Sequence, residues 1–428
     1  MTQTGDEFRV ALKSQKVAVF GLGRSGMAAA HLLRHSGAEV WAYDSLDEKK
    51  LGDRLKQLKS QGVKLQLGRG PGREISTFDF IVCSPGIPPH SLWVQKARVN
   101  GITLIDEIEL AWRLCKKPIV AVTGTNGKTT QTLFLAHVLN RMGKRAVPCG
   151  NLGRPLSAFL LENGYKADAY IMEVSSFQLS RTRNFRPEVA VALNLSPNHL
   201  DWHPDAMDYA DAKARLVNNL RPEDCALLNS DDAWCVGLSE QTLGHVRWFE
   251  GSSAQARELV AREVVGALGM DEDWEDSCVE GFVRPEHRMQ RLNVARGVEW
   301  INDSKSTNPG STLHALRSVE TPAILLMGGR NKGLRFSVMK EMLADRVKQV
   351  LLFGEAAEEI ERDLRGAVPI EIFHNLNLAV WRARELALPG DTVLLSPACA
   401  SFDAYESYEE RGRHFQRLVE EKITAEVS

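Results

Sequence analysis

Cysteine is scarce in this sequence of 428 residues, and its copies are widely separated. The seven cysteines include no Cys-x-x-Cys pair, and an odd number cannot all pair with one another. These features argue against a disulfide framework and against a zinc ribbon. They are typical of a reducing compartment, and we therefore expect a cytoplasmic protein.

The sequence also lacks an excess of positive charge and any long apolar run. Lys and Arg number 53 against 55 Asp and Glu, whereas a protein that binds nucleic acid or an anionic membrane needs a positive surface. No apolar stretch approaches the roughly 18 residues that span a bilayer. The polar start, Met1–Glu7, does not resemble a signal peptide. We expect no nucleic-acid partner and no membrane association.

What the sequence does contain is the balance of an ordinary globular protein. Hydrophobic residues make up 43% and charged residues 25%. At about 150 residues per domain, the length predicts two to four domains.

The first part of the sequence, residues 1–106, has the pattern of a βαβ unit. The apolar run Val17–Phe20 predicts a buried strand, the segment Gly21-Leu-Gly-Arg-Ser-Gly26 predicts a turn before a helix, and Val40–Tyr43 predicts a second strand. Asp44, which ends that strand, stands near the usual place of a ribose-binding acid. The pattern is typical of a Rossmann-like domain, although any nucleotide diphosphate could use the same turn.

The second part, residues 107–284, carries the most informative segment, Gly124-Thr-Asn-Gly-Lys-Thr129. It lies between a predicted strand, Ile119–Val122, and a predicted helix that reaches about Met142. Such a loop offers N–H groups and a helix dipole to phosphates, with a lysine for the terminal phosphates and a threonine for Mg²⁺. The segment departs from the general GxxxxGK[ST] pattern, because Val122 takes the place of the first glycine. The alternative, a Gly-Asn turn before a helix with Lys128 as a solvated cation, is disfavoured by the strand–loop–helix context.

Polar residues after two further predicted strands could complete this site. Glu173 follows Ala169–Met172 and could bind Mg²⁺, or it could be an acid at a helix N-terminus. His199 follows Val189–Leu193 and could bind metal or substrate, although a lone loop histidine usually does neither. Lys213 lies in an alanine-rich, helix-favouring stretch, and on local evidence it is a surface residue.

The third part, residues 285–428, again alternates apolar runs with polar loops. The runs Ala323–Met327, Val350–Phe353 and Val393–Leu395 are continuously apolar, which predicts strands covered on both faces. Within the polar loop that follows Trp300 and Ile301, Asp303 and Lys305 could form an ion pair or contact a phosphate, or could belong to a capped turn. We therefore predict three consecutive α/β domains: Rossmann-like (1–106), a central P-loop-type ATPase domain (107–284) and Rossmann-like (285–428).

Taken in this order, the segments resemble the Mur ligases, the ATP-dependent amino-acid-adding enzymes of peptidoglycan synthesis. The resemblance runs from about Lys16 to Arg417. Its most specific segments are Thr123-Gly-Thr-Asn-Gly-Lys-Thr129, Glu173-Val-Ser-Ser-Phe-Gln-Leu179, Asn198-His-Leu-Asp201 and Asn302-Asp-Ser-Lys-Ser-Thr-Asn308. The run Leu395–Asp403, with Tyr408-Glu-Glu-Arg-Gly412 after it, is most similar to the branch that adds D-glutamate.

The resemblance implies an ATP-dependent acid–amino-acid ligase. Such an enzyme would join D-glutamate to UDP-N-acetylmuramoyl-L-alanine through an acyl phosphate, releasing ADP and phosphate, in cytoplasmic peptidoglycan precursor synthesis. The implied ligands are ATP, two Mg²⁺ ions and these two small-molecule substrates, and we expect a monomer. The alternatives are a sister Mur ligase that adds a different amino acid, or a ligase similar to folylpolyglutamate synthase.

The resemblance also implies roles for individual residues. It assigns ATP to Gly124, Thr125, Asn126, Gly127, Lys128, Thr129, Thr130, Arg288 and Asp303. It assigns metal to Thr129, Glu173, His199 and Lys213, the last as a carbamate (N6-carboxylysine), and catalysis to Lys128, His199 and Lys213. It assigns the UDP-sugar to Arg24, Ser25 and Asn151, phosphate to Lys305, and D-glutamate to Thr307, Lys332, Ser401 and Tyr408.

Three positions depart from the family pattern. The family's asparagine-rich segment that meets adenine aligns with Gly251-Ser-Ser-Ala-Gln-Ala-Arg257, which has no asparagine. Tyr408 stands where phenylalanine is common, and Asp44-Ser-Leu46 lacks the arginine that some relatives carry.

Two readings from other classes compete with a ligase. A Rossmann oxidoreductase that binds NAD through residues 21–44 would leave the predicted phosphate loop at Gly124–Thr129 and the third part of the chain unexplained. A nucleotide-binding regulator without chemistry would not need Lys128, Glu173 and Lys213 together.

Overall fold

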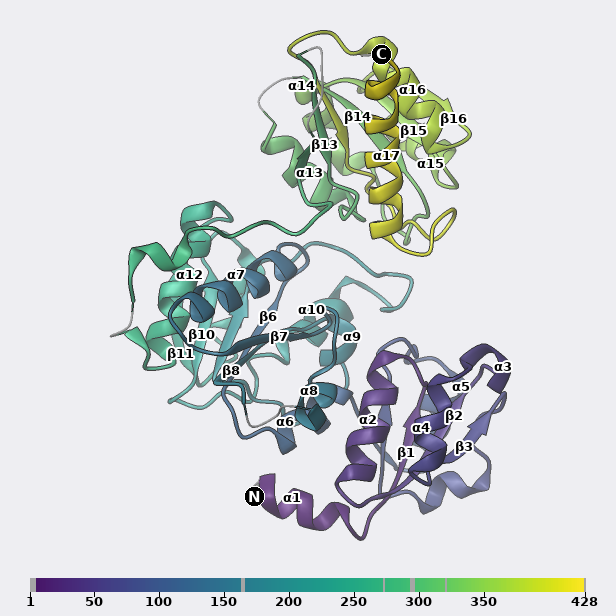
Figure 1. Ribbon diagram of the computed structural model, residues 1–428, viewed down its shortest axis with the longest axis vertical. Coiled ribbons are helices and arrows are strands. Elements are labelled where there is room, and N and C mark those ends of the chain that lie inside the picture. The colour runs from purple at the N-terminus through teal and green to yellow at the C-terminus, as the bar shows by residue number, and fades with distance from the viewer. Residues whose placement is uncertain (1–4, 163–165, 272–273, 293–296, 320–321, 427–428) are drawn as a thin grey trace. The chain divides into compact units, whose positions relative to one another are not determined.

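Three β-sheets follow one another along the chain, and helices connect their strands (Figure 1). The computed structural model describes residues 5–162, 166–271, 274–292, 297–319 and 322–426. Within these residues the fold is α/β, with two parallel sheets and one mixed sheet, which confirms the predicted series of three α/β domains. No helix in the described ranges is both long and apolar enough to cross a membrane.

The first sheet is parallel and has the strand order β3-β2-β1-β4-β5. Its strands are β1 (Lys16–Phe20), β2 (Glu39–Asp44), β3 (Lys64–Leu67), β4 (Phe80–Cys83) and β5 (Thr103–Ile105). The helices are α1 (Gly5–Leu12), α2 (Arg24–His35), α3 (Glu48–Leu51), α4 (Arg54–Ser60), η1 (Arg73–Thr77) and α5 (Leu92–Val99). Because β1 lies between β2 and β4, the glycine turn after β1 meets the carboxyl ends of both neighbours.

The second sheet is also parallel, in the order β11-β10-β9-β6-β8-β7. Its strands are β6 (Ile119–Thr123), β7 (Ala146–Gly150), β8 (Ala169–Glu173), β9 (Val189–Ala192), β10 (Cys225–Asn229) and β11 (His245–Phe249). The helices are α6 (Glu107–Leu114), α7 (Lys128–Arg141), α8 (Leu156–Glu162), α9 (Ser176–Leu179), α10 (Ala206–Ala214), α11 (Ala233–Leu238), α12 (Ala254–Ala267) and η3 (Asp276–Val279). The loop after β6 therefore lies between the ends of β8 and β9.

The third sheet has the order β12-β13-β17-β14-β15-β16, and only its edge strand β12 runs antiparallel to its neighbour. Its strands are β12 (Gln290–Leu292), β13 (Glu299–Asn302), β14 (Ala323–Gly328), β15 (Val347–Phe353), β16 (Ile370–Phe373) and β17 (Thr392–Leu395). The helices are α13 (Pro309–Arg317), η4 (Ser337–Met339), α14 (Lys340–Arg346), α15 (Ala357–Leu364), α16 (Leu376–Leu386) and α17 (Tyr408–Glu426).

The central strands are buried on both faces, as their continuous apolar runs predict. In β6, Ile119 and Ala121 pack into one hydrophobic cluster, while Val120 and Val122 pack into another with α7 and α12. Side chains alternate between the faces of a strand, so a strand that serves two cores must be apolar at every position.

The contacts of the chain divide it into two compact units. One unit holds residues 1–195 and 207–282, and the other holds 196–206 and 283–428. The first two sheets belong to one unit because a hydrophobic cluster joins them: Leu110 and Leu114 of α6 pack with Val17 and Val19 of β1. The boundaries after residues 106 and 284 remain predictions.

Candidate active site

The loop between β6 and α7 is shaped to present its backbone to a ligand. Gly124 and Gly127 adopt φ angles of 151° and 83°, which favour glycine. Asn194, just past β9, fixes the loop: its carbonyl accepts the N–H of Thr125 at 2.9 Å, and its Oδ1 accepts the N–H of Asn126 at 2.9 Å. The glycine conformations and this clamp place the start of α7, with its positive dipole end, beside the loop.

Lys128, in the first turn of α7, lies back over the same loop. Its Nζ donates to the carbonyl oxygens of Gly124 at 2.8 Å and Thr125 at 2.9 Å. The cation is thus held beside the N–H groups that a phosphate would meet. Thr130 follows in the same turn and is half-buried.

Glu173 lies at the carboxyl end of β8, where it is buried and meets two predicted ligands. The Thr129 hydroxyl donates to its Oε2 at 2.6 Å, and the Asn151 amide donates to its Oε1 at 2.7 Å. The following short helix is capped by Ser175, so Glu173 is not its N-cap. The structure brings Thr129, Glu173 and Asn151 together.

Lys213 corrects the local sequence interpretation, because its side chain is only 1% exposed and is not on the surface. Its Nζ donates to the Gly124 carbonyl at 2.8 Å and to Thr123 Oγ1 at 3.3 Å. Burial, reinforced by the Lys128 charge and opposed by Glu173, lowers the pKa of the Lys213 amine well below its ordinary value. A larger share of this amine is therefore neutral and nucleophilic than for a surface lysine.

The donors around the loop fit Mg²⁺ in chemical type. A threonine hydroxyl and a carboxylate are hard oxygen donors, and they meet here within one hydrogen bond. Few protein ligands are needed, because Mg²⁺ usually keeps waters and substrate phosphates. Across the described ranges, no group of three or more His, Cys, Asp or Glu side chains is placed to hold a metal ion.

The glycine turn of the first sheet forms a second candidate site. A Cβ on Gly26 would lie 1.8 Å from the Gly21 carbonyl oxygen, so the turn is closed tightly against the start of α2. Asp44 accepts the N–H groups of Leu22 at 2.6 Å and Leu46 at 2.8 Å, which shows that this carboxylate shapes the turn itself. Of the predicted UDP-sugar contacts, Arg24 donates to the Gly153 carbonyl at 3.1 Å, and Ser25 lies beside it in α2.

In the other unit, Asp303 follows β13 and is buried. Its carboxylate accepts hydrogen bonds from the Ser306 and Ser396 hydroxyls and from the N–H of Met289. Burial raises its pKa to about 6, and those hydrogen bonds and the Arg288 charge oppose the rise. Asp303 therefore ties together the ends of β13 and β17.

Four of the remaining predicted ligands of this unit lie in two pairs. The Lys305 Nζ lies 3.7 Å from the ring centroid of Tyr408, and the Lys332 Nζ donates to Thr307 Oγ1 at 3.5 Å. Ser401 is buried in the loop after β17. His199 adopts a left-handed φ of 56° in segment 196–206, and its carbonyl accepts the N–H of His203. The predicted ligands are thus divided between the units, with the phosphate loop in one and His199 and Asp303 in the other.

Sequence reasoning missed two side chains beside these sites. The Tyr209 hydroxyl lies 3.0 Å from Thr125 Oγ1, and the Lys213 Nζ lies 5.0 Å from the Tyr209 ring centroid. The signal was available, because Tyr209 precedes Lys213 by one helical turn. The second is Arg411, fully buried at the start of α17.

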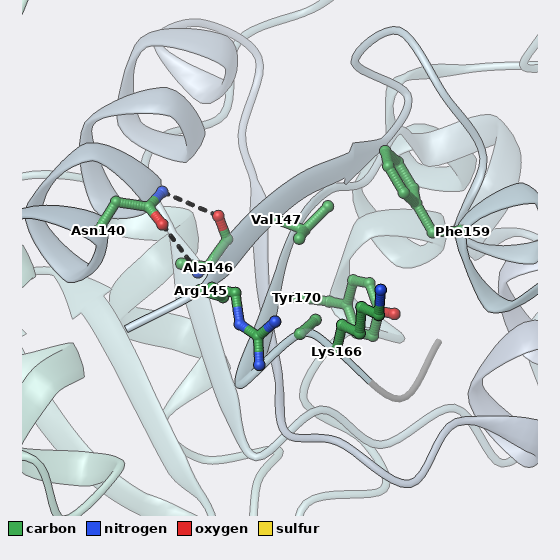
Figure 2. A pocket seen from close by; sticks show the side chains of 8 residues that line it. Asn140, Arg145, Ala146, Val147, Phe159, Lys166 and Tyr170 are labelled. Carbon is green, nitrogen blue, oxygen red and sulfur yellow. Dashed lines mark hydrogen bonds between the residues drawn. The ribbon is translucent and has the colours of Figure 1, made fainter. Parts of the chain in front are cut away.

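A separate hollow of about 200 Å³ lies at the opposite end of the second sheet (Figure 2). Ala146, at the start of β7, and Tyr170, near the start of β8, line it together with Arg145 and Lys166. The Asn140 amide beside it is already occupied by the N–H and carbonyl of Ala146. Because the phosphate loop lies at the carboxyl ends of these parallel strands, the hollow is not part of the candidate active site.

Comparison with known proteins extends these observations to the whole chain. Three family models match it: "Mur ligase MurD-like, N-terminal domain" over residues 15–106, "Mur ligase middle domain" over 122–264, and "Mur ligase, glutamate ligase domain" over 287–399. A pseudomurein peptide ligase type C from Methanothermus fervidus has a similar fold, with a TM-score of 0.58 at 19% identity over 96% of this chain and 100% of its own.

Curated relatives are similar over almost the entire length. Proteins named UDP-N-acetylmuramoylalanine–D-glutamate ligase from Caldanaerobacter subterraneus subsp. tengcongensis and Myxococcus xanthus are 35% and 37% identical. The alignments cover 95% and 96% of this chain, and 98% and 99% of the relatives. With such identity along both chains, and with family models matching all three sheets, this chain belongs to the Mur ligase family.

Proposed function

We propose that this chain is the D-glutamate-adding ligase of the family. It joins the terminal carboxylate of UDP-N-acetylmuramoyl-L-alanine to the amine of D-glutamate, and ATP is cleaved to ADP and phosphate. The relatives that share about a third of its residues carry the name of this reaction. The observation that carries the proposal is the meeting of the phosphate loop, the Thr129–Glu173 pair and buried Lys213 at one edge of the second sheet.

The chemistry has two steps because a carboxylate is a poor electrophile. A carboxylate oxygen of the first substrate attacks the γ-phosphorus of ATP, ADP leaves, and an acyl phosphate forms. The amine of D-glutamate then attacks the acyl carbon, and the tetrahedral intermediate expels phosphate as the amide forms. Catalysis of both steps consists mainly of alignment and of stabilising negative charge.

The residues of the phosphate loop fit the first step. The N–H groups of the loop and the start of α7 would bind the phosphates of ATP, and Lys128 would move from the loop carbonyls to the transferred phosphoryl group. Mg²⁺, when bound, would neutralise phosphate charge, and Thr129 and Glu173 would supply oxygen ligands for it. Arg288 and Asp303 are the proposed ATP contacts in the other unit.

We further propose a second Mg²⁺ with Glu173, His199 and a carbamate on Lys213 among its ligands. A neutral amine can attack CO₂ and lose a proton to form a carbamate, and the lowered pKa of Lys213 favours that reaction. The modification replaces a buried cation with an anion that carries oxygen ligands. Asn151, Arg24 and Ser25 are the proposed contacts of the UDP-sugar.

The amino-acid side of the reaction is proposed to lie in the other unit. Thr307, Lys332, Ser401 and Tyr408 are the proposed D-glutamate contacts, and Lys305 the proposed phosphate contact. The ring of Tyr408 beside Lys305 supports this grouping. Because the reaction uses ATP and a nucleotide-linked precursor, we place it in the cytoplasm, with the chain acting as a monomer.

The test is phosphate release with ATP, Mg²⁺ and UDP-N-acetylmuramoyl-L-alanine across a panel of amino acids. We expect release with D-glutamate and not with L-glutamate, L-lysine or meso-diaminopimelate. Release with another amino acid alone would favour a sister ligase, and release with dihydrofolate and L-glutamate would favour a folylpolyglutamate-synthase-like enzyme. Absence of release with every acceptor would contradict the proposal.

A further inference from the structure

Arg181, just past α9, is a buried arginine outside the proposed ligand set. Its side chain is 8% exposed, and its guanidinium donates to main-chain carbonyls of a different domain. Nη1 donates to the Ser84 carbonyl at 3.2 Å, and Nη2 donates to the Ile87 carbonyl. Both acceptors belong to the loop that follows β4 in the first sheet.

That loop forms a wall of the glycine turn. The Ser84 hydroxyl donates to the Gly21 carbonyl at 2.8 Å, and the Ser84 N–H donates to the Phe20 carbonyl at 2.8 Å. A Cβ built on Gly21 would lie 3.1 Å from the Ser84 Cβ. A shift of the Ser84 loop would therefore displace the turn at which α2 begins.

The other end of this connection leads to Glu173. Arg181 lies eight positions after Glu173, and the residues between form α9, which a Ser175–Gln178 capping box begins. The N–H of Arg181 donates to the Gln178 carbonyl at 3.3 Å. The segment from Glu173 to Arg181 is thus held by its own hydrogen bonds. It therefore links the position of Glu173 in the central domain to the Ser84 loop of the first domain.

The charge of the guanidinium has a buried neighbour. Asp106, the N-cap of α6, is fully buried, and its attraction to Arg181 opposes the rise in its pKa that burial causes. Two carbonyls three residues apart also suit a planar, forked donor better than a lysine ammonium.

We propose that Arg181 is a positioning residue that fixes the glycine turn of the first domain relative to the Glu173 segment of the central domain. The inference rests on the proposed function, in which the turn binds the UDP portion of the substrate. Arg181 touches no reacting atom in the proposed reaction. It sets the place of the turn and therefore governs the affinity for the nucleotide-sugar rather than for ATP.

The test compares Arg181→Met and Arg181→Lys with a matched control, Arg183→Met. Arg183 is exposed and lies two residues after Arg181 in the chain. We measure the KM of each substrate and kcat, and we titrate UDP and a non-hydrolysable ATP analogue by calorimetry. For Arg181→Met we expect the KM of UDP-N-acetylmuramoyl-L-alanine and the Kd of UDP to rise at least about tenfold. The KM of ATP and the Kd of the analogue should change by less than about threefold.

The lysine variant should recover part of the UDP affinity, and the control should match the wild type. Unchanged UDP affinity in Arg181→Met would overturn the inference, as would an equal loss of UDP and ATP affinity, which a general structural role predicts. If the methionine variant does not fold, Arg181→Gln takes its place under the same criteria. If the wild type binds UDP but releases no phosphate, the proposed function is wrong. The UDP affinities of the wild type and Arg181→Met would then still test the role of Arg181. A wild type that does not bind UDP would overturn both.

Discussion

At the scale of single residues, Lys213 shows how burial changes what a side chain can do. Burial removes the water that stabilises an ammonium group, so a larger fraction of the Lys213 side chain is the neutral amine. The neutral amine can react with CO₂. We predict that Lys213→Ala lowers kcat at least about a hundredfold, because the variant cannot form the proposed carbamate. A short carboxylic acid such as acetate should restore part of the activity by filling the space, and bicarbonate should not.

Phosphate release with and without acetate measures this effect. Lys144→Ala removes a lysine three residues past the C-terminal end of α7, and this variant should behave as the wild type. Full turnover in Lys213→Ala would remove the carbamate role, and equal rescue by bicarbonate and acetate would contradict the proposed chemistry.

Asp303 is a second residue whose burial has a measurable consequence. Its pKa is raised from 3.8 to about 6, so the folded state binds its proton more tightly than the unfolded state. The stability it contributes is present below about pH 4 and is lost as the pH rises through about 6. We predict that this group alone lowers the free energy of unfolding by roughly 3 kcal/mol across that window, at about 1.4 kcal/mol per pKa unit.

Urea unfolding of the wild type and Asp303→Asn between pH 4 and pH 7 tests this dependence. As the pH rises, the free energy of unfolding of the wild type should fall steadily relative to that of Asp303→Asn. Asp345→Asn removes an exposed carboxylate from the same unit and should leave the pH profile unchanged. A constant difference between wild type and Asp303→Asn over the whole window would contradict the predicted titration.

At the scale of elements, Arg411 joins the first turn of α17 to the carboxyl ends of three strands. Its guanidinium donates to the Gly328 carbonyl at the end of β14, to the Cys399 and Ala400 carbonyls after β17, and to the hydroxyl and carbonyl of Ser304 after β13. Burial lowers its pKa to about 10, so it stays charged at neutral pH. Without it, these buried acceptors would lose a charged donor.

We therefore predict that Arg411→Met lowers the free energy of unfolding by roughly 3 to 5 kcal/mol, the range expected when buried partners of a charged group are left unsatisfied. Urea unfolding monitored by tryptophan fluorescence measures the loss. Arg413→Met, at an exposed position two residues after Arg411 in α17, is the control and should change stability by less than about 0.5 kcal/mol. A similar loss in both variants would contradict the role of the buried contacts.

The elements of the sheets could be predicted because their signal is local. A strand buried on both faces is apolar throughout, so runs such as Ile119–Val122 and Val350–Phe353 indicate strands without knowledge of their neighbours. The antiparallel edge strand β12 was not predicted, because the sequence Gln290–Leu292 has no such run. The burial of Lys213 was also missed, since an alanine-rich helix gives no sign of what covers it.

The features that could not be predicted depend on long-range contacts. Arg181 and Arg411 donate to main-chain carbonyl groups, several of them far away in the chain, and the sequence does not mark such acceptors because every residue has a carbonyl group. The phosphate loop was recognisable because its glycines, lysine and threonine act within six residues of one another. Side chains that act locally are thus predicted more readily than those that join distant loops.

At the scale of the whole molecule, the hydrophobic clusters predict how the chain unfolds. One cluster contains β1 residues and Leu110 of α6 together, while Ile108 and Ala111 of α6 pack in a cluster of the second sheet, so α6 links the two sheets across the boundary predicted at residue 106. The clusters of the third sheet contain only residues from 289 onwards. Compact units with separate cores unfold separately unless a large apolar interface joins them.

We therefore predict two calorimetric transitions for the ligand-free protein, not three and not one. Gly26→Ala should lower only the transition of the unit that holds residues 1–195, because its Cβ would collide with the Gly21 carbonyl. Arg411→Met should lower only the other transition. A third transition that moves with Gly26→Ala alone would mean that residues 1–106 unfold by themselves, and the shared cluster around Leu110 would then contribute too little to hold the first two sheets together. A single transition lowered by both variants would instead mean that the two units unfold as one, and their separate cores would not decide the cooperativity of the chain.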